Sequence, residues 1–92
     1  MTDMGNRSIR RGTDFIESNV DGETVLLQLS TGRVYALAGP AAASWAAFAE
    51  PVTLDGAVAR LQKQFDVDAA TCAADLRAFV TEMCDLGFLV AE

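Results

Sequence analysis

Ninety-two residues are enough for one domain, near the lower end of what folds without disulfides or bound metals. The composition is 51% hydrophobic, the formal net charge is −6 and there is no histidine. No apolar run approaches the ~18 residues that a membrane span requires, and no apolar segment follows the charged N-terminus as in a secretory signal. The sequence therefore predicts a cytoplasmic protein with no membrane contact.

The N-terminal segment is polar and carries three arginines, Arg7, Arg10 and Arg11. Such a segment is typical of a solvated terminus, although a basic arm can also steer an acidic partner. We expect residues 1–12 to form a flexible tail and residues 13–92 to form a single domain.

The next part of the chain alternates between apolar and polar residues, as strands do. Thr13–Val20 is a weaker strand candidate, and the Asp21-Gly22 pair after it favours a tight turn. Thr24–Leu29 is the strongest candidate. Ser30–Gly32 fits a three-residue hairpin loop, and Arg33–Leu37 is the returning strand.

After Leu37 the apolar spacing changes from two residues to three or four, which indicates helices. Pro40 suits a first helical position, and Trp45 and Phe48 are expected in the core. Thr53 predicts the cap of a second helix, and a third is expected from about Ala69 to Leu86. The order predicts an α+β, winged-helix-like fold, with a three-stranded antiparallel sheet followed by three helices.

Catalysis and DNA binding find no support in these residues. There is no histidine to act as a base, no serine lies in a nucleophile motif, and no Cys/His spacing suggests a metal site. The third helix and its cap carry Asp68, Asp75, Glu82 and Asp85 against Arg77, a charge that repels DNA. We therefore expect no enzyme activity, no cofactor, no metal and no nucleic-acid partner.

A small sheet leaves two edges, and an exposed edge is either covered or used to pair with another chain. The sequence resembles the PqqD-like family, whose members are the domains that recognise the leader peptides of ribosomally made, modified peptides. The resemblance rests on the segments VLLQLSTGRVYAL, GPAAASW, TLDGAVARL and ADLRAFVTEMCDLGFL, in that order and spacing. The resemblance runs from about Glu23 to Val90, about three quarters of the chain.

The resemblance implies that the leader of a precursor peptide adds as a strand to the open edge of the hairpin, over a groove walled by the third helix. It implies a partner enzyme, a leader peptidase or another modifying enzyme, to which the leader is presented. The implied edge strand is Arg33, Val34, Tyr35, Ala36 and Leu37, and the implied groove wall is Asp75, Leu76, Phe79, Val80, Glu82 and Met83.

Three questions stay open in the sequence. Outward N–H groups alternate along an edge, so either Val34 and Ala36 or Tyr35 and Leu37 would face the leader. Met83 is assigned to the groove because methionine suits adaptable binding surfaces, whereas an apolar helical stripe normally packs inward. The edge could also pair with a second copy of the chain in a structural or regulatory homodimer.

The hairpin also bears on the class of peptide. Family members in pyrroloquinoline quinone synthesis carry a Pro-Glu-Gly turn where this chain has Ser30–Gly32, and the hairpin looks more like the free-standing recognition proteins of lasso-peptide clusters. A lasso-peptide leader is therefore the expected ligand, with a chaperone role in pyrroloquinoline quinone synthesis as the alternative.

Overall fold

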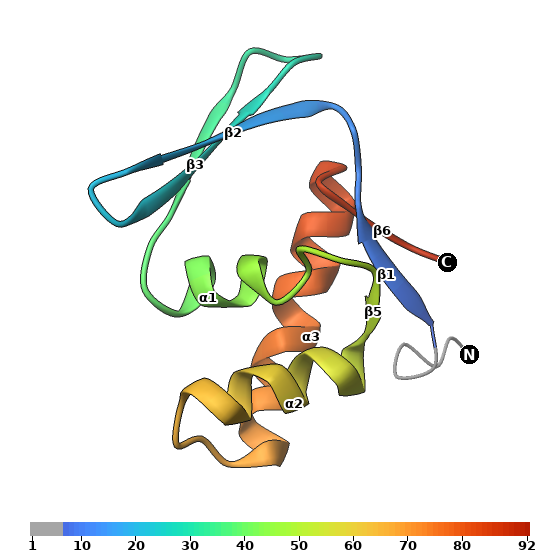
Figure 1. Ribbon diagram of the computed structural model, residues 1–92. Helices are drawn as coiled ribbons and strands as arrows, with labels where there is room; N and C mark the ends of the chain where they lie inside the picture. Colours follow the sequence, from blue (N-terminus) through green and yellow to red (C-terminus); the bar gives the residue numbers. More distant parts are fainter. Residues whose placement is uncertain (1–6) are drawn as a thin grey trace.

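The computed structural model describes residues 7–92 and shows two small antiparallel sheets and three helices in this part of the chain (Figure 1). The elements are β1 (Ser8–Arg11), β2 (Phe15–Val20), β3 (Glu23–Gln28), β4 (Val34–Leu37), α1 (Pro40–Ala46), β5 (Val52–Thr53), α2 (Leu54–Gln64), α3 (Ala69–Leu86) and β6 (Leu89–Ala91). The predicted α+β, winged-helix-like class is confirmed, and the predicted sheet is the one with strand order β2-β3-β4.

The β2-β3-β4 sheet is built from two hairpins. Val20 pairs with Glu23 across a two-residue turn, in which Asp21 and Gly22 both have positive φ, at 52° and 82°. This left-handed backbone is what a tight hairpin turn requires, and it explains the Asp-Gly pair. The second loop closes with Gly32 at φ 74°. Both turns lie where the sequence predicts them.

The second sheet has the strand order β5-β1-β6. Its central strand, β1, lies in the segment 1–12 that was predicted to be a flexible tail, so that prediction is wrong for residues 8–11. Residues 1–6 lie outside the described residues, but Ser8–Arg11 form a strand paired on both sides, with Ile9 fully buried. Two short partner strands beyond α1 and α3 hold this basic segment, a long-range pairing that local sequence patterns do not reveal.

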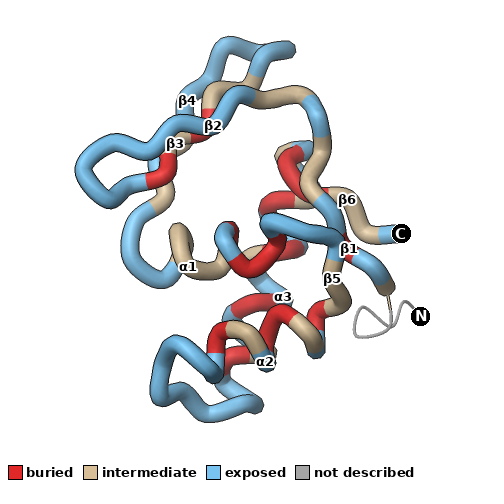
Figure 2. Tube along the Cα trace, viewed as in Figure 1, coloured by how far each residue is buried: buried red, intermediate tan, exposed pale blue. Residues whose placement is uncertain are grey.

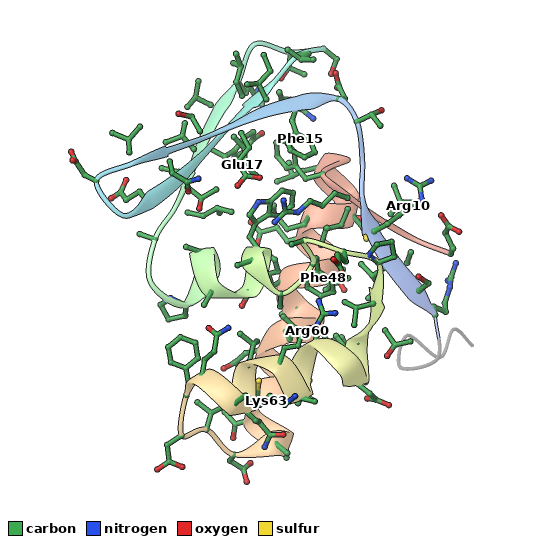
Figure 3. The ribbon with its side chains drawn as sticks, viewed as in Figure 1. Arg10, Phe15, Glu17, Phe48, Arg60 and Lys63 are labelled. Atoms are coloured by element: carbon green, nitrogen blue, oxygen red, sulfur yellow. The ribbon has the colours of Figure 1, made fainter. Side chains whose placement is uncertain are left out.

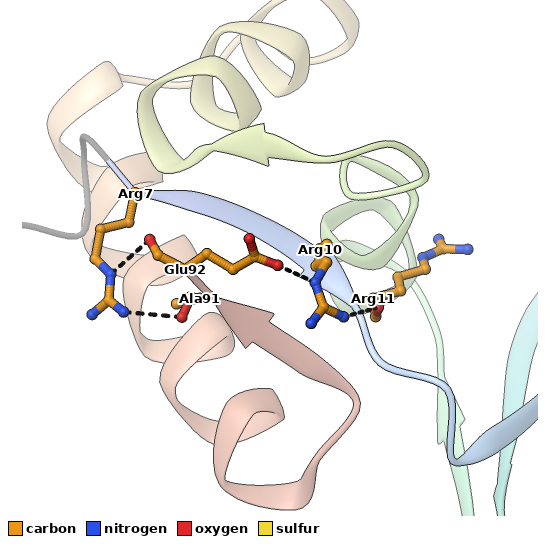
Figure 4. Close-up of polar contacts among 5 residues, drawn as sticks. All are labelled: Arg7, Arg10, Arg11, Ala91 and Glu92. Atoms are coloured by element: carbon orange, nitrogen blue, oxygen red, sulfur yellow. Dashed lines mark hydrogen bonds and ion pairs between the residues drawn. The ribbon is translucent and has the colours of Figure 1, made fainter.

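Arginines add a second layer of contacts between β1 and β6 (Figure 4). Arg7 donates to the backbone oxygens of Ala91 and Glu92, at 3.0 and 2.9 Å. Arg10 forms an ion pair with the Glu92 carboxylate. The basic patch of the sequence therefore contributes to the fold.

The helices α2 and α3 begin and end within a residue or two of the predicted positions, and α1 begins at Pro40 as predicted. The pattern up to Pro51 predicts a longer first helix, but α1 already ends at Ala46. Thr53 caps α2 by accepting a hydrogen bond from the Gly56 N–H at 3.1 Å. Asp68 caps α3 in the same way, through the Thr71 N–H at 3.0 Å. Gly87 ends α3 in the left-handed conformation, at φ 87°.

The core lies where the helices face one another and where the β2-β3-β4 sheet meets them (Figure 2). Phe15 and Tyr35 from the sheet both contact the Phe88 ring edge-on, with centroids 5.7 and 5.2 Å away. Trp45 of α1 also contacts Phe15 edge-on at 5.4 Å. Trp45 and Phe48 are buried as predicted. This aromatic cluster fixes the sheet against the helices, and so it fixes the position of β4.

Candidate functional site

The hydrogen bonds of the β3–β4 ladder show which backbone groups of β4 are free. Gln28 N donates to Arg33 O at 2.8 Å, one residue before β4 begins. Hydrogen-bonded pairs alternate along an antiparallel ladder, and Leu26 pairs with Tyr35 and Thr24 with Leu37 in the same phase. Tyr35 and Leu37 therefore bond to β3. Val34 and Ala36 turn their N–H and C=O groups to the open edge.

The ladder on the other side of β3 confirms this phase. Leu29 N donates to Asp14 O, which places the odd-numbered residues of β3 in bonding pairs with β2. The even-numbered residues of β3 are then left for β4, as the Gln28 bond requires. Within residues 7–92 no strand pairs with the far side of β4. Of the two pairs that the sequence left open, Val34 and Ala36 are the residues whose N–H groups point to the open edge.

The side chains of β4 divide between two faces. Tyr35 and Leu37 are half-buried and pack against the core. Val34 is 64% exposed and Ala36 is exposed, on the outer face of the sheet. An added strand would therefore place alternate side chains on the outer face and on the face that the helices cover. Arg33 precedes β4 and is exposed, so the edge strand starts one residue later than predicted.

The residues predicted for the groove wall on α3 divide into buried and accessible ones. Val80 and Met83, assigned to the groove, are buried in the core at 0% and 4% exposure, and those two assignments are wrong. Leu76 is buried as well. The apolar stripe of α3 packs inward at these positions, where it joins the core cluster that α3 shares with α1, α2 and the strands.

A second stripe on α3 remains accessible. Asp75 and Glu82 are exposed, and Phe79 and Leu86 are half-buried. These four positions are spaced i, i+4, i+7 and i+11, so they share one flank of the helix. The C-terminal end of the flank lies beside the sheet, since Gln28 of β3 donates to the Leu86 carbonyl at 2.6 Å. Leu86 is the member of this flank that the predicted groove wall does not include, although its apolar spacing from Phe79 could have indicated it.

A pocket that the sequence did not predict lies beyond the end of β4. It has a volume of about 380 Å³ and is formed by the start of α1, the end of α2 and the first half of α3. Its lining is mostly apolar: Gly39, Pro40, Ala43, Ser44, Leu61, Phe65, Val67, Thr71, Cys72, Asp75 and Leu76. Two residues of the predicted groove wall, Asp75 and Leu76, are among them. Because the pocket needs three separate helices, no local pattern could have indicated it.

A cluster of Arg11, Glu17 and Trp45 connects β1, β2 and α1. Arg11 lies over the Trp45 ring, 4.2 Å from its centroid, and forms an ion pair with Glu17 at 3.1 Å. Glu17 also accepts a hydrogen bond from the Trp45 indole N–H at 3.0 Å. Figure 3 shows Phe15 and Glu17 projecting from β2 toward the helices. The cluster anchors the sheet from the side opposite β4.

Burial affects the ionisation of two side chains. It lowers the pKa of Arg11, an effect that Glu17 opposes, and it raises the pKa of the Cys84 thiol. Cys84 and Cys72 are both free. Among residues 7–92 no cluster of histidine, cysteine or acidic side chains has the arrangement of a metal site, and no helix is long and apolar enough to cross a bilayer.

The comparisons with known proteins agree with this geometry. Residues 23–89 match the family described as coenzyme PQQ synthesis protein D, PqqD. The structure described as "TbiB1 in Complex with the TbiA(beta) Leader Peptide" is similar to this chain, with a TM-score of 0.79 and 25% sequence identity over 87% of this chain and 93% of that chain. No curated protein sequence matches. The family match includes β3, β4 and all three helices, and therefore both the free edge and the pocket.

Proposed function

The chain belongs to the family of coenzyme PQQ synthesis protein D, and we propose that it is a non-catalytic adaptor that binds the leader segment of a ribosomally synthesised precursor peptide. The leader adds as a strand to the open edge of β4. The adaptor then presents the precursor to a separate processing enzyme, a leader peptidase or another modifying enzyme.

The observation that carries the proposal is the free edge itself. Val34 and Ala36 offer backbone donors and acceptors that no described strand uses. Backbone bonds of this kind give an added peptide its affinity and register, and contacts of alternate side chains give selectivity. The flank of Asp75, Phe79, Glu82 and Leu86 supplies those contacts on the helical side. The similar structure contains a leader peptide, which supports the same class of ligand here.

The lasso-peptide class is the favoured ligand. Its support is the Ser30–Gly32 loop, which differs from the Pro-Glu-Gly turn of the pyrroloquinoline quinone proteins. A chaperone role in pyrroloquinoline quinone synthesis is the alternative within the family. The neighbouring genes distinguish these two roles. A gene for a short precursor beside genes for a protease and a synthetase-like cyclase would favour the lasso-peptide role.

Self-association is a competing use of the same edge. Two copies could pair their β4 strands, but each carries a net charge of −6, which opposes their approach. If leader binding is the function, a dimer must dissociate when the leader binds, and sedimentation with and without leader measures this. A dimer that persists with the leader bound would place the leader elsewhere.

Proline substitution at Ala36 tests strand addition. The Ala36 N–H faces the open edge, so Ala36→Pro removes a donor to the leader without removing a bond to β3. The loss of one bond, together with the steric effect of the ring, should weaken binding about tenfold. The measurement is fluorescence anisotropy with a synthetic leader from a precursor encoded beside the gene.

Asn19→Pro is the matched control. Asn19 lies on β2, with its N–H directed to the opposite edge of the same sheet. The substitution also removes the Asn19 side-chain oxygen that accepts a hydrogen bond from the Thr24 hydroxyl at 3.2 Å, so it should lower stability by at least as much and leave leader affinity unchanged. Undiminished binding by folded Ala36→Pro would refute the β4 edge as the binding site. Loss of binding in Asn19→Pro alone would move the site to β2.

A further inference from the structure

The open edge of β4 and the accessible flank of α3, the two walls of the predicted groove, belong to different elements. Their spacing therefore depends on the contacts that hold the β2-β3-β4 sheet against the end of α3. The edge-on contact of Tyr35 with Phe88 is one of these. Apolar contacts are non-directional, whereas a hydrogen bond specifies both a distance and a direction. A polar contact between the two walls would therefore fix their alignment.

Gln28, the last residue of β3, supplies such a contact. Its side-chain amide donates to the Leu86 carbonyl at 2.6 Å. Among the hydrogen bonds of residues 7–92, this is the one that joins the β2-β3-β4 sheet to α3. Leu86 is also a member of the accessible flank. The bond therefore ties the sheet directly to a residue of the opposite wall.

The Leu86 carbonyl is available to Gln28 because α3 ends there. The last four carbonyls of a helix have no partner within it, and the turn at Gly87 uses those of Met83 and Cys84. A carbonyl oxygen can only accept a hydrogen bond. The orientation of the Gln28 amide is thus determined, with its Nε2 toward the helix and its Oε1 toward the hairpin loop.

The Oε1 atom of Gln28 holds the loop between β3 and β4. It accepts a hydrogen bond from the Thr31 hydroxyl at 2.9 Å, and that hydroxyl accepts one from the Arg33 N–H at 3.1 Å. Hydrogen bonds therefore run without interruption from Arg33, the residue before β4, through Thr31 and Gln28 to Leu86. We call this series the Gln28 relay. The backbone of Gln28 closes the same loop, through Arg33 O and the Gly32 N–H, both at 2.8 Å.

The relay ends beside the start of the open edge. Val34 follows Arg33 directly, and it is the first residue of β4 whose N–H and C=O groups point to that edge. The relay therefore holds the start of the edge in a fixed position relative to Leu86. A peptide that pairs with Val34 and contacts the flank meets two walls that are already aligned. Such a preformed site binds more tightly, because less conformational freedom is lost on binding.

We propose that Gln28 and Thr31 are positioning residues for the leader peptide, and that their relay presets the spacing between the open edge of β4 and the accessible flank of α3. Neither side chain has to touch the peptide, because Gln28 projects toward the helix and Thr31 lies in the hairpin loop. The inference rests on the proposed strand addition and adds the residues that preform its site.

Two substitutions of similar shape interrupt the relay. Thr31→Val removes the hydroxyl from an exposed loop residue, and Gln28→Met removes the amide but keeps a side chain of similar length. Each should weaken binding of the synthetic leader about three- to tenfold, the effect of one hydrogen bond, mainly through faster dissociation. Fluorescence anisotropy measures the affinity, and displacement of labelled leader in a stopped-flow instrument measures the dissociation rate.

Three further variants separate positioning from a general loss of stability. Thr31→Ser keeps the hydroxyl and should bind the leader as the unaltered chain does. Gln62→Met is the matched control for Gln28→Met, because Gln62 also donates its amide to a backbone carbonyl, that of Val67, at 3.4 Å in the helical half. Its leader affinity should be unchanged. The double variant Gln28→Met with Thr31→Val should bind no more weakly than Gln28→Met alone, since both residues act through one relay.

Unchanged leader affinity in folded Thr31→Val would refute the positioning role, and so would losses that simply add in the double variant. Equal losses in Thr31→Val and Thr31→Ser would attribute the effect to the shape of the loop and refute the relay. Thr31→Val carries the test if Gln28→Met does not fold, because Thr31 is exposed.

The Ala36→Pro variant distinguishes failure of this inference from failure of the proposed function. If Ala36→Pro loses leader affinity while the relay variants keep it, the positioning role is refuted and strand addition stands. If Ala36→Pro binds the leader as tightly as the unaltered chain, strand addition is refuted, and the positioning role with it.

Discussion

Met83 and Phe79 differ in burial, and the apolar spacing of a helix does not by itself predict that difference. Both belong to the apolar spacing of α3, yet Met83 is 4% exposed and Phe79 is half-buried. A stripe predicts which face of a helix is apolar, but the neighbouring helices determine where that face ends. Asp75, Phe79 and Glu82, which the sequence assigned to the groove wall, lie on an accessible flank. Val80 and Met83, which it assigned to the same wall, are instead part of the buried core.

Alanine at these two positions should have opposite effects. Met83→Ala removes a buried side chain and should cost about 2–5 kcal/mol of folding free energy, with leader affinity retained by the folded fraction. Phe79→Ala removes a partly accessible ring and should cost less stability. It should weaken leader binding by about 1 kcal/mol or more, which is roughly fivefold in the dissociation constant. Chemical denaturation and anisotropy on both variants measure the two effects. Equal stability losses with unchanged affinity would remove Phe79 from the groove.

At the scale of elements, local signals were sufficient for the hairpins and the helices. The Asp-Gly turn, the glycine at 32, and the caps at Thr53 and Asp68 each act within a few residues, and each element lies where they predict it. The phase of the ladder was not predictable, because it follows from which residues of β3 bond to β2 and which to β4. That phase determines which residues can bind a peptide backbone.

The β5-β1-β6 sheet and the pocket were missed for a related reason. β1 has one fully buried apolar residue, Ile9, and its partner strands are two and three residues long. The pocket is assembled from three helices. In both cases the feature exists only once distant segments are packed, so no window of the sequence contains it.

At the scale of the whole molecule, the chain combines an open sheet edge with no histidine, and its described residues form no metal cluster. We expect the purified chain alone to leave a precursor peptide unchanged in mass. Processing should accelerate only when the cognate peptidase is added, because the adaptor raises the local concentration of leader at the enzyme. Mass spectrometry over time, with the Ala36→Pro variant as control, measures both. Turnover by the isolated chain would overturn the adaptor role.

Residue-resolved amide hydrogen exchange tests the central claim, that the leader pairs with Val34 and Ala36. In the free chain the Tyr35 and Leu37 amides are bonded to β3 and should already exchange slowly, whereas those of Val34 and Ala36 should exchange fast. Adding saturating leader peptide should slow the exchange of Val34 and Ala36 by tenfold or more and change the β2 edge little. Fast exchange at Val34 and Ala36 in the saturated complex, or new protection along β2 instead, would contradict the account.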